Sequence, residues 1–165
     1  MALPDPGEFS SGIVTTTWLN AMRDLALAAL NPPSTVADRL ASQSIQNSTG
    51  TLMAFDTQIF DNYDMFTPTS SSITLAESGL FVVTAGATWA PNATGVRIIS
   101  IQQNGADVPG ALDERVALGG GAPTYQLTSQ HVVGSAGDTI TLNTFQTSGG
   151  ALGVTGRIGM TRVSG

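Results

Sequence analysis

The sequence contains no cysteine and no lysine, and charged residues make up only 11% of its 165 residues. Without cysteine, the chain can form neither disulfide bonds nor thiolate metal sites. Its six cations are all arginines, scattered along the chain, and twelve acidic residues bring the formal net charge to −6. Because phosphate binding requires clustered cations, this pattern argues against a nucleic-acid partner.

Long apolar runs are also missing. No run approaches the ~18 residues that a transmembrane helix needs, and the first nine residues, MALPDPGEF, lack the basic and apolar regions of a signal peptide. We therefore expect no membrane insertion, synthesis in the cytoplasm of the producing cell, and export only by lysis or as cargo.

The N-terminal third of the chain contains one helical pattern. Residues 1–11 are rich in proline, glycine and acid and predict an extended arm, and Thr15 to Thr17 offer helix N-caps. Apolar residues then recur at helical spacing, and with Phe9 of the arm they form the predicted anchoring and assembly set: Trp18, Leu19, Met22, Leu25, Ala26, Ala29 and Leu30. Asn31-Pro32-Pro33 ends the helix, since proline cannot donate to the helical ladder. We therefore assign residues 1–33 to an arm and an anchoring helix.

Residues 34–50 are polar and predict a linker, with at most a weak helical turn around residues 37–41. A linker of this length exceeds usual compact connections, so the helix is expected to dock on a larger assembly or on its own copies. A helix capping the chain's own β-domain is the alternative. A short helix needs a packing partner in either case, and the length of the linker favours docking or trimerisation over the alternative.

From about residue 51 the apolar period changes from 3.6 to 2. Phe81, Val83 and Trp89 mark one strand, Asn104-Gly105 marks a hairpin, and strands with glycine-containing turns continue almost to the C-terminus. Many short strands without intervening helices indicate an all-β sandwich over residues 51–165.

No catalytic constellation stands out. His131 is the only histidine, it alternates with apolar residues inside a predicted strand, and no Gly-x-Ser-x-Gly motif accompanies it. This context suits a packed or interface histidine. We therefore expect a protein without enzymatic activity and without a cofactor.

Other candidate sites have weak patterns. Asp56, Asp61 and Asp64 could offer oxygens to calcium, but the spacing of a calcium loop is missing, so a solvated acidic loop is preferred. Residues 113–115 and 119–121 predict surface turns. Tyr63 and Tyr125 are the candidates for a carbohydrate platform.

Two parts of the chain resemble known families. Residues 9–24 with Asn31-Pro32-Pro33 resemble the N-terminal segment of minor structural proteins from phages of actinobacteria. The β region resembles phage versions of the complement and tumour-necrosis-factor-like jelly roll, on the Gly79-Leu80-Phe81 entry into a central strand and on further matching segments: residues 52–56, 61–65, 73–83, 89, 92–97, 101–105 and 137–140. Phe81 stands where that family usually has tyrosine, which leaves the fold expectation intact because both rings fill a core site.

The resemblance implies a homotrimer of jelly rolls exposed on a virion and anchored through its N-terminal segment. Its partners would be copies of itself, other virion proteins of the tail or the major capsid, and host surface glycans. A minor tail or tail-tip protein is favoured slightly over a capsid decoration protein. A free carbohydrate-binding trimer and a depolymerase are alternatives from other classes.

Overall fold

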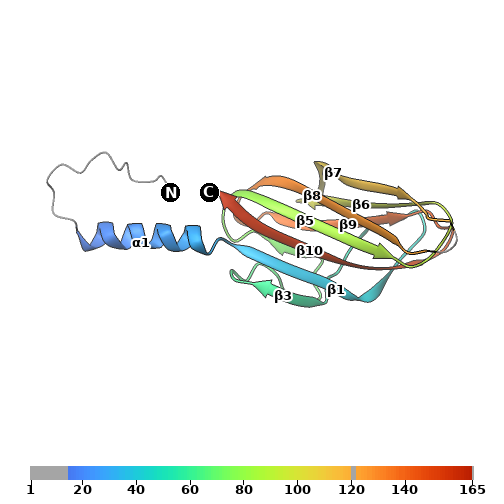
Figure 1. Cartoon of the computed structure of the whole chain (residues 1–165), viewed down its shortest axis with the longest axis horizontal. Helices are drawn as coiled ribbons and strands as arrows, with labels where there is room; N and C mark the ends of the chain where they lie inside the picture. The colour runs from blue at the N-terminus through green and yellow to red at the C-terminus, as the bar shows by residue number, and fades with distance from the viewer. Residues whose placement is uncertain (1–14, 120–121, 165) are drawn as a thin grey trace.

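The computed structural model describes residues 15–119 and 122–164. One helix precedes a series of strands (Figure 1). The elements are α1 (Thr16–Leu30), β1 (Ser34–Ile45), β2 (Thr51–Leu52), β3 (Thr57–Asp61), β4 (Ser72–Thr74), β5 (Gly79–Trp89), β6 (Val96–Gln103), β7 (Ala106–Val116), β8 (Thr124–Gly134), β9 (Thr139–Gln146) and β10 (Leu152–Ser164).

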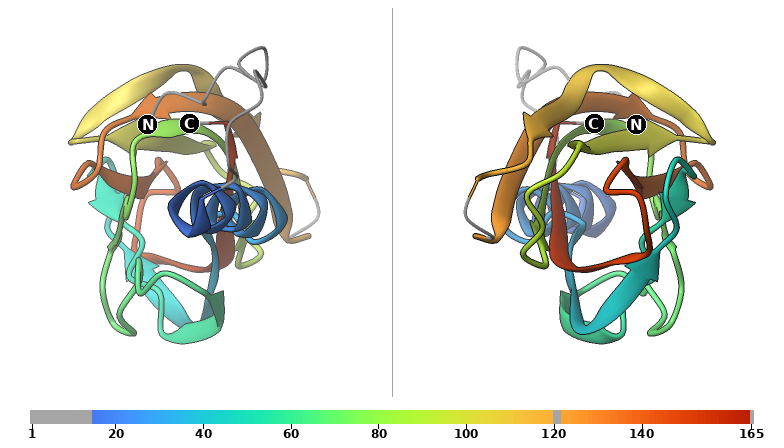
Figure 2. Two further views of the ribbon diagram at one scale, coloured as in Figure 1. Left: turned by 90° about the vertical axis from the view of Figure 1, so that its left-hand side faces the viewer. Right: turned by 90° about the vertical axis from the view of Figure 1, so that its right-hand side faces the viewer.

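The strands form two antiparallel sheets. One sheet has the order β3-β1-β10-β5-β8, and the other has the order β2-β9-β6-β7, with β4 also pairing with β9. Seen along the long axis of the molecule, the sheets enclose a common interior (Figure 2). The all-β jelly-roll sandwich expected from the sequence is therefore confirmed.

The core lies between the two sheets, and β5 shows how the sequence builds it. Phe81, Val83, Ala85, Ala87 and Trp89 alternate along this strand and are at most 4% exposed. Side chains in a strand point to opposite faces in turn, so this alternation places all five against the other sheet. The core site expected for Phe81 is confirmed, since this side chain is fully buried.

Helix α1 begins and ends where the sequence indicates. The Thr15 hydroxyl accepts a hydrogen bond from the Trp18 amide at 3.3 Å, which caps the first turn. The helix ends at Leu30, before the two prolines, and extends away from one end of the sandwich (Figure 1). None of the helices in the described ranges is long and apolar enough to cross a membrane.

The predicted linker at residues 34–50 is wrong. Residues 34–45 form β1, which pairs with β10 on one side and with β3 on the other, so the sandwich begins at Ser34 and not at residue 51. Two charged residues, Asp38 and Arg39, interrupt the apolar alternation of this strand and hide its period. Only residues 31–33 separate α1 from β1, and the expectation of docking can no longer rest on linker length.

The predicted surface turn at residues 113–115 is also wrong. These residues belong to β7, where they pair with residues 97–99 of β6. The hairpin that joins the two strands is as expected, because Asn104 and Gly105 both have positive φ, at 51° and 81°. Strand β7 lies at the edge of its sheet, and its polar side chains face solvent there, which removes the apolar signal of a strand.

Candidate assembly surface

Strand β8 has its apolar side turned away from the core of its own chain. Tyr125, Leu127 and Val133 are 66%, 66% and 77% exposed, whereas the alternating Gln126 and Thr128 are 5% and 7% exposed. Burial of apolar side chains is the main favourable term in folding, so a strand normally presents them inward. A contiguous patch of exposed apolar side chains is typical of an interaction surface.

Hydrogen bonds make the polar inward side of β8 stable. The Gln126 side-chain oxygen accepts the indole N–H of Trp89 at 2.7 Å. Its amide nitrogen donates to the backbone oxygens of Arg97 at 3.0 Å and Asp113 at 2.6 Å. Buried polar groups are tolerated when they are fully paired, so Gln126 ties β8 to three other strands.

The opposite edge of the same sheet also presents apolar side chains. Val36 of β1 pairs in register with Phe60 of β3, and Phe60 is 49% exposed. Leu40, farther along β1, is 65% exposed. The outer face of the five-stranded sheet therefore has one apolar edge on β8 and a different one on β1 and β3. We call this outer face the assembly face.

The centre of the assembly face is a shallow depression around a glycine. Gly86 of β5 lies between Arg157 of β10 and Leu127 of β8 in the pairing register. A Cβ atom at Gly86 would lie 3.2 Å from the backbone oxygen of Gln126 and 3.5 Å from a methyl carbon of Leu127. Around Gly86 the surface forms a shallow groove of about 380 Å³, with Tyr125 on its wall.

One ion pair crosses this groove. Arg157 donates to both carboxylate oxygens of Asp38, from Nε at 2.6 Å and from a terminal nitrogen at 2.7 Å. These hydrogen bonds raise the pKa of Arg157 above its usual value. A bidentate pair holds the arginine side chain across the sheet, so the groove has a fixed polar end and little net charge.

The acidic residues considered for calcium serve the backbone instead. Asp56 accepts hydrogen bonds from the amides of Leu40 and Ala41 at 3.1 and 2.9 Å, and these bonds are the largest cause of a lowered pKa for Asp56. Asp61 accepts amides of the loop that follows it at 3.1 and 2.8 Å, and Asp64 is exposed. Residues 15–119 and 122–164 contain no group of three or more His, Cys, Asp or Glu that could hold a metal ion.

His131 and the two tyrosines occupy different environments. His131 is exposed on the assembly face beside Val82, which disfavours a packed position within the chain. In the described part of the chain, no hydrogen bond joins its imidazole to a hydroxyl or a carboxylate. Tyr63 packs against the core, and only Tyr125 offers an open ring. The alternation along β8 puts Tyr125, Leu127 and His131 on one side of the strand. The direction of that side depends on the partners of Gln126, which are distant in the sequence.

The predicted anchoring residues fall into two groups. Phe9 lies outside the described residues. The others lie on α1, where Leu19, Met22, Leu25 and Leu30 are 54%, 39%, 38% and 81% exposed, Ala26 and Ala29 are exposed, and Trp18 is partly exposed. The helix has at most a few contacts with the strands. The structure thus brings these residues together on an element that stands beside the sandwich.

Comparisons with known proteins identify the fold of the sandwich but do not assign its role. No protein-family model and no curated protein matches the sequence. The solved globular domain of zebrafish complement 1qA protein is similar with a TM-score of 0.63 and 10% identity, over 79% of this chain and 97% of that one. Eiger TNF from S. frugiperda is similar with a TM-score of 0.55 and 11% identity, over 80% of this chain and 94% of that one. At these identities the likeness concerns the fold, and the chain has a complement and TNF-like jelly roll.

Proposed function

We propose that this protein is a non-enzymatic structural component of a tailed-phage particle. In this proposal the jelly roll assembles as a homotrimer through the assembly face, and the segment before the jelly roll attaches the trimer to the particle. The observation that carries the homotrimer is the inverted strand β8, which exposes Tyr125, Leu127 and Val133 while it buries Gln126 and Thr128.

The positions of the two apolar edges favour a ring. A two-fold interface brings one patch against the same patch of a second copy. A head-to-tail contact joins two different patches, and it forms a ring when the rotation between copies closes. The β8 edge and the β1–β3 edge lie on opposite sides of the glycine-floored centre. One copy can therefore place its β8 edge against the β1–β3 edge of the next. The fold similarity to complement and TNF-like domains also supports self-association.

The test of self-association compares two leucines. Leu127 on β8 and Leu112 on β7 are 66% and 53% exposed, and they lie on the outer faces of different sheets. We expect the wild-type chain to be a trimer by native mass spectrometry. Leu127→Glu should produce monomers, because burying an unpaired carboxylate costs several kcal/mol, whereas Leu112→Glu should remain trimeric.

Circular dichroism serves as the folding control, since both leucines are exposed in the single chain. A wild-type monomer at micromolar concentration would contradict the proposal. Loss of the trimer in Leu112→Glu together with its retention in Leu127→Glu would assign the interface to the other sheet.

The particle role rests on the sequence resemblance of residues 9–33 to minor structural proteins of phages. The location on the tail is favoured by that resemblance, and a capsid decoration protein is the alternative. A free sugar-binding trimer is a further candidate, for which the exposed ring of Tyr125 is the only observation among the described residues. In the trimer proposed above, that ring is covered by the next copy.

A further inference from the structure

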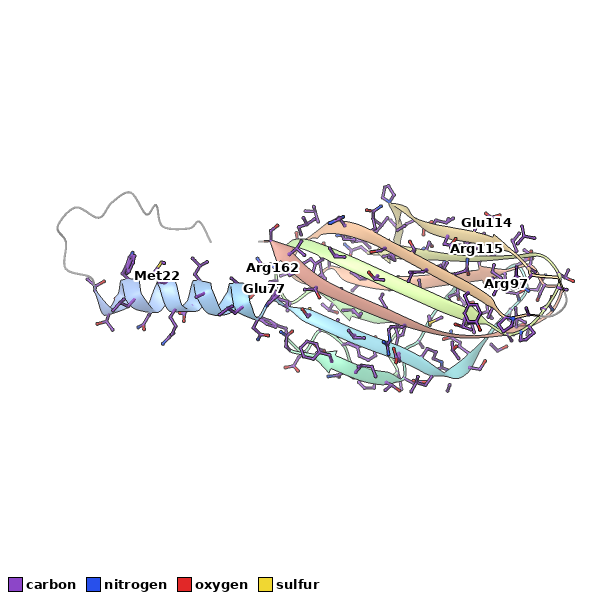
Figure 3. The ribbon with its side chains drawn as sticks, viewed as in Figure 1. Met22, Glu77, Arg97, Glu114, Arg115 and Arg162 are labelled. Carbon is purple, nitrogen blue, oxygen red and sulfur yellow. The ribbon has the colours of Figure 1, made fainter. Side chains whose placement is uncertain are left out.

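Helix α1 cannot account for its own stability. It has 15 residues, and helices of this length are marginal in water without a packing partner. Leu19, Met22 and Leu25 remain exposed, and the helix has few contacts with the strands. Figure 3 shows the labelled Met22 side chain on the helix, well away from the sandwich. The strands of the sandwich therefore leave these three side chains uncovered.

The spacing of the stripe indicates what kind of partner fits it. Trp18, Met22, Leu25 and Ala29 follow one another at intervals of four, three and four residues. This is the repeat of the two core positions in a coiled coil, where the side chains of one helix enter the gaps of another helix with the same repeat. The stripe is therefore suited to a parallel helix of identical sequence.

Charge on the helix does not oppose such packing. Arg23 and Asp24 are its only charged residues, and they form an ion pair at 2.7 Å with both side chains more than 60% exposed. In the heptad they occupy positions outside the seam formed by Met22 and Leu25. Copies of the helix can approach one another without burying an unpaired charge.

The junction with the sandwich fixes where the helix leaves the head. The Asn62 side-chain amide donates to the Asn31 side-chain oxygen at 2.8 Å and to the Pro32 carbonyl at 3.0 Å, and its oxygen accepts the Ser34 amide at 2.8 Å. The Pro33 carbonyl accepts the Arg162 amide at 2.9 Å. Arg162 in turn pairs with Glu77 at the same end of the sandwich (Figure 3).

An anchored junction has a consequence for a ring of copies. Every copy starts its helix from the same point of the head, and two prolines limit the freedom of the connecting residues. A rotationally symmetric ring therefore holds its helices parallel and in the same register, which is the arrangement that the 4-3-4 spacing requires.

We propose that α1 is a self-association stalk, in which the stripe of Trp18, Met22, Leu25 and Ala29 is covered by α1 of the other copies in a parallel bundle. This inference rests on the homotrimer proposed above. It assigns the stripe to contacts between copies, so attachment to a particle falls to the outer side of the bundle and to residues before it.

The absence of cysteine from the chain allows a direct test by cross-linking. Met22→Cys introduces a thiol in the seam, and Asn20→Cys introduces one on the exposed opposite side of the helix. With a short bismaleimide, we expect the Met22→Cys chain to yield covalently linked pairs within the purified trimer at least tenfold faster than the Asn20→Cys chain. Equal rates for the two variants in a trimeric protein would overturn the inference.

A second measurement separates the stalk from the head. Combining Met22→Cys with Leu127→Glu weakens the assembly face and leaves α1 unchanged. Retained cross-linking at high protein concentration in this double variant would show that the helices associate by themselves. A native trimer whose Met22→Cys variant does not cross-link would overturn the stalk while the homotrimer stands, and a wild-type monomer would instead overturn the homotrimer.

Discussion

At the scale of single residues, Arg97 is a buried charge that forms no ion pair with any residue in the described part of the chain. The side chain is fully buried at the end of the sandwich opposite α1 (Figure 3). It donates to the backbone oxygens of Asn92, Thr94 and Val96 at 3.3, 3.0 and 3.0 Å. Desolvation lowers the pKa of Arg97. The guanidinium thus holds the loop between β5 and β6 closed over the core.

We expect Arg97→Met to lower the free energy of unfolding by about 2–3 kcal/mol, because three carbonyl oxygens lose charge-assisted hydrogen bonds. Release of the desolvation cost offsets part of this loss. Arg115, its register partner on β7, is the control, since it is 56% exposed in a surface pair and Arg115→Met should stay within about 0.5 kcal/mol of wild type. Urea denaturation measures both values, and equal effects would contradict the structural role of Arg97.

At the scale of the elements, the sequence predicted those whose pattern is local. Thr15 and Asn31-Pro32-Pro33 mark the ends of α1, and the alternation from Phe81 to Trp89 marks β5 and its inward side. The sequence did not predict strand β1, because Asp38 and Arg39 interrupt the alternation of apolar residues along it. Their partners, Arg157 and Asp56, are distant in the sequence.

The candidate surface was predictable only in part. The alternation of β8 groups Tyr125, Leu127 and Val133 on one side, but the period of a strand does not say which side faces the core. That choice depends on Trp89 and on backbone oxygens of β6 and β7, which satisfy Gln126. Contacts between distant strands leave no periodic signal in the sequence.

Asp138 joins two turns at one end of the sandwich and predicts a dependence of stability on pH. Its carboxylate accepts the Ser135 amide at 2.9 Å and the side-chain amides of Gln103 and Asn104, both at 2.9 Å. These bonds lower the pKa of Asp138, with the Ser135 amide as the largest cause. Because the pKa is lower in the folded state than in the unfolded state, this stabilisation is complete above the unfolded value of about 3.9 and is lost as the pH falls through the folded value.

We therefore expect the melting temperature of the wild-type chain to be constant between about pH 7 and 5 and to fall below about pH 4. Asp138→Asn should melt at a lower temperature than wild type at pH 7, and the difference should shrink at pH 3. Asp24→Asn, on the exposed helix, serves as the control and should follow the wild-type curve. A constant difference between Asp138→Asn and wild type across this range would contradict the assignment.

At the scale of the whole molecule, the buried core and helix α1 are separate parts of the structure. No buried hydrophobic residue of the described core precedes Ala37, so the jelly roll contains its own core without α1. The assembly face likewise lies entirely within the strands. Helix α1 can therefore be removed without removing a buried side chain of the described core.

Deletion of residues 1–30 should leave a folded jelly roll that no longer joins phage particles, since the proposed attachment lies in the deleted part. Deletion of residues 1–14 should reduce incorporation, because only the outer side of the α1 bundle then remains for the proposed attachment, while the purified protein remains a trimer. Quantitative mass spectrometry of purified particles measures incorporation and also the copy number. A handful of copies per particle supports a tail location, and tens to hundreds support capsid decoration. Normal incorporation of the chain that lacks residues 1–30 would show that the jelly roll itself makes the contact with the particle, and the N-terminal segment would then serve only to hold the copies together.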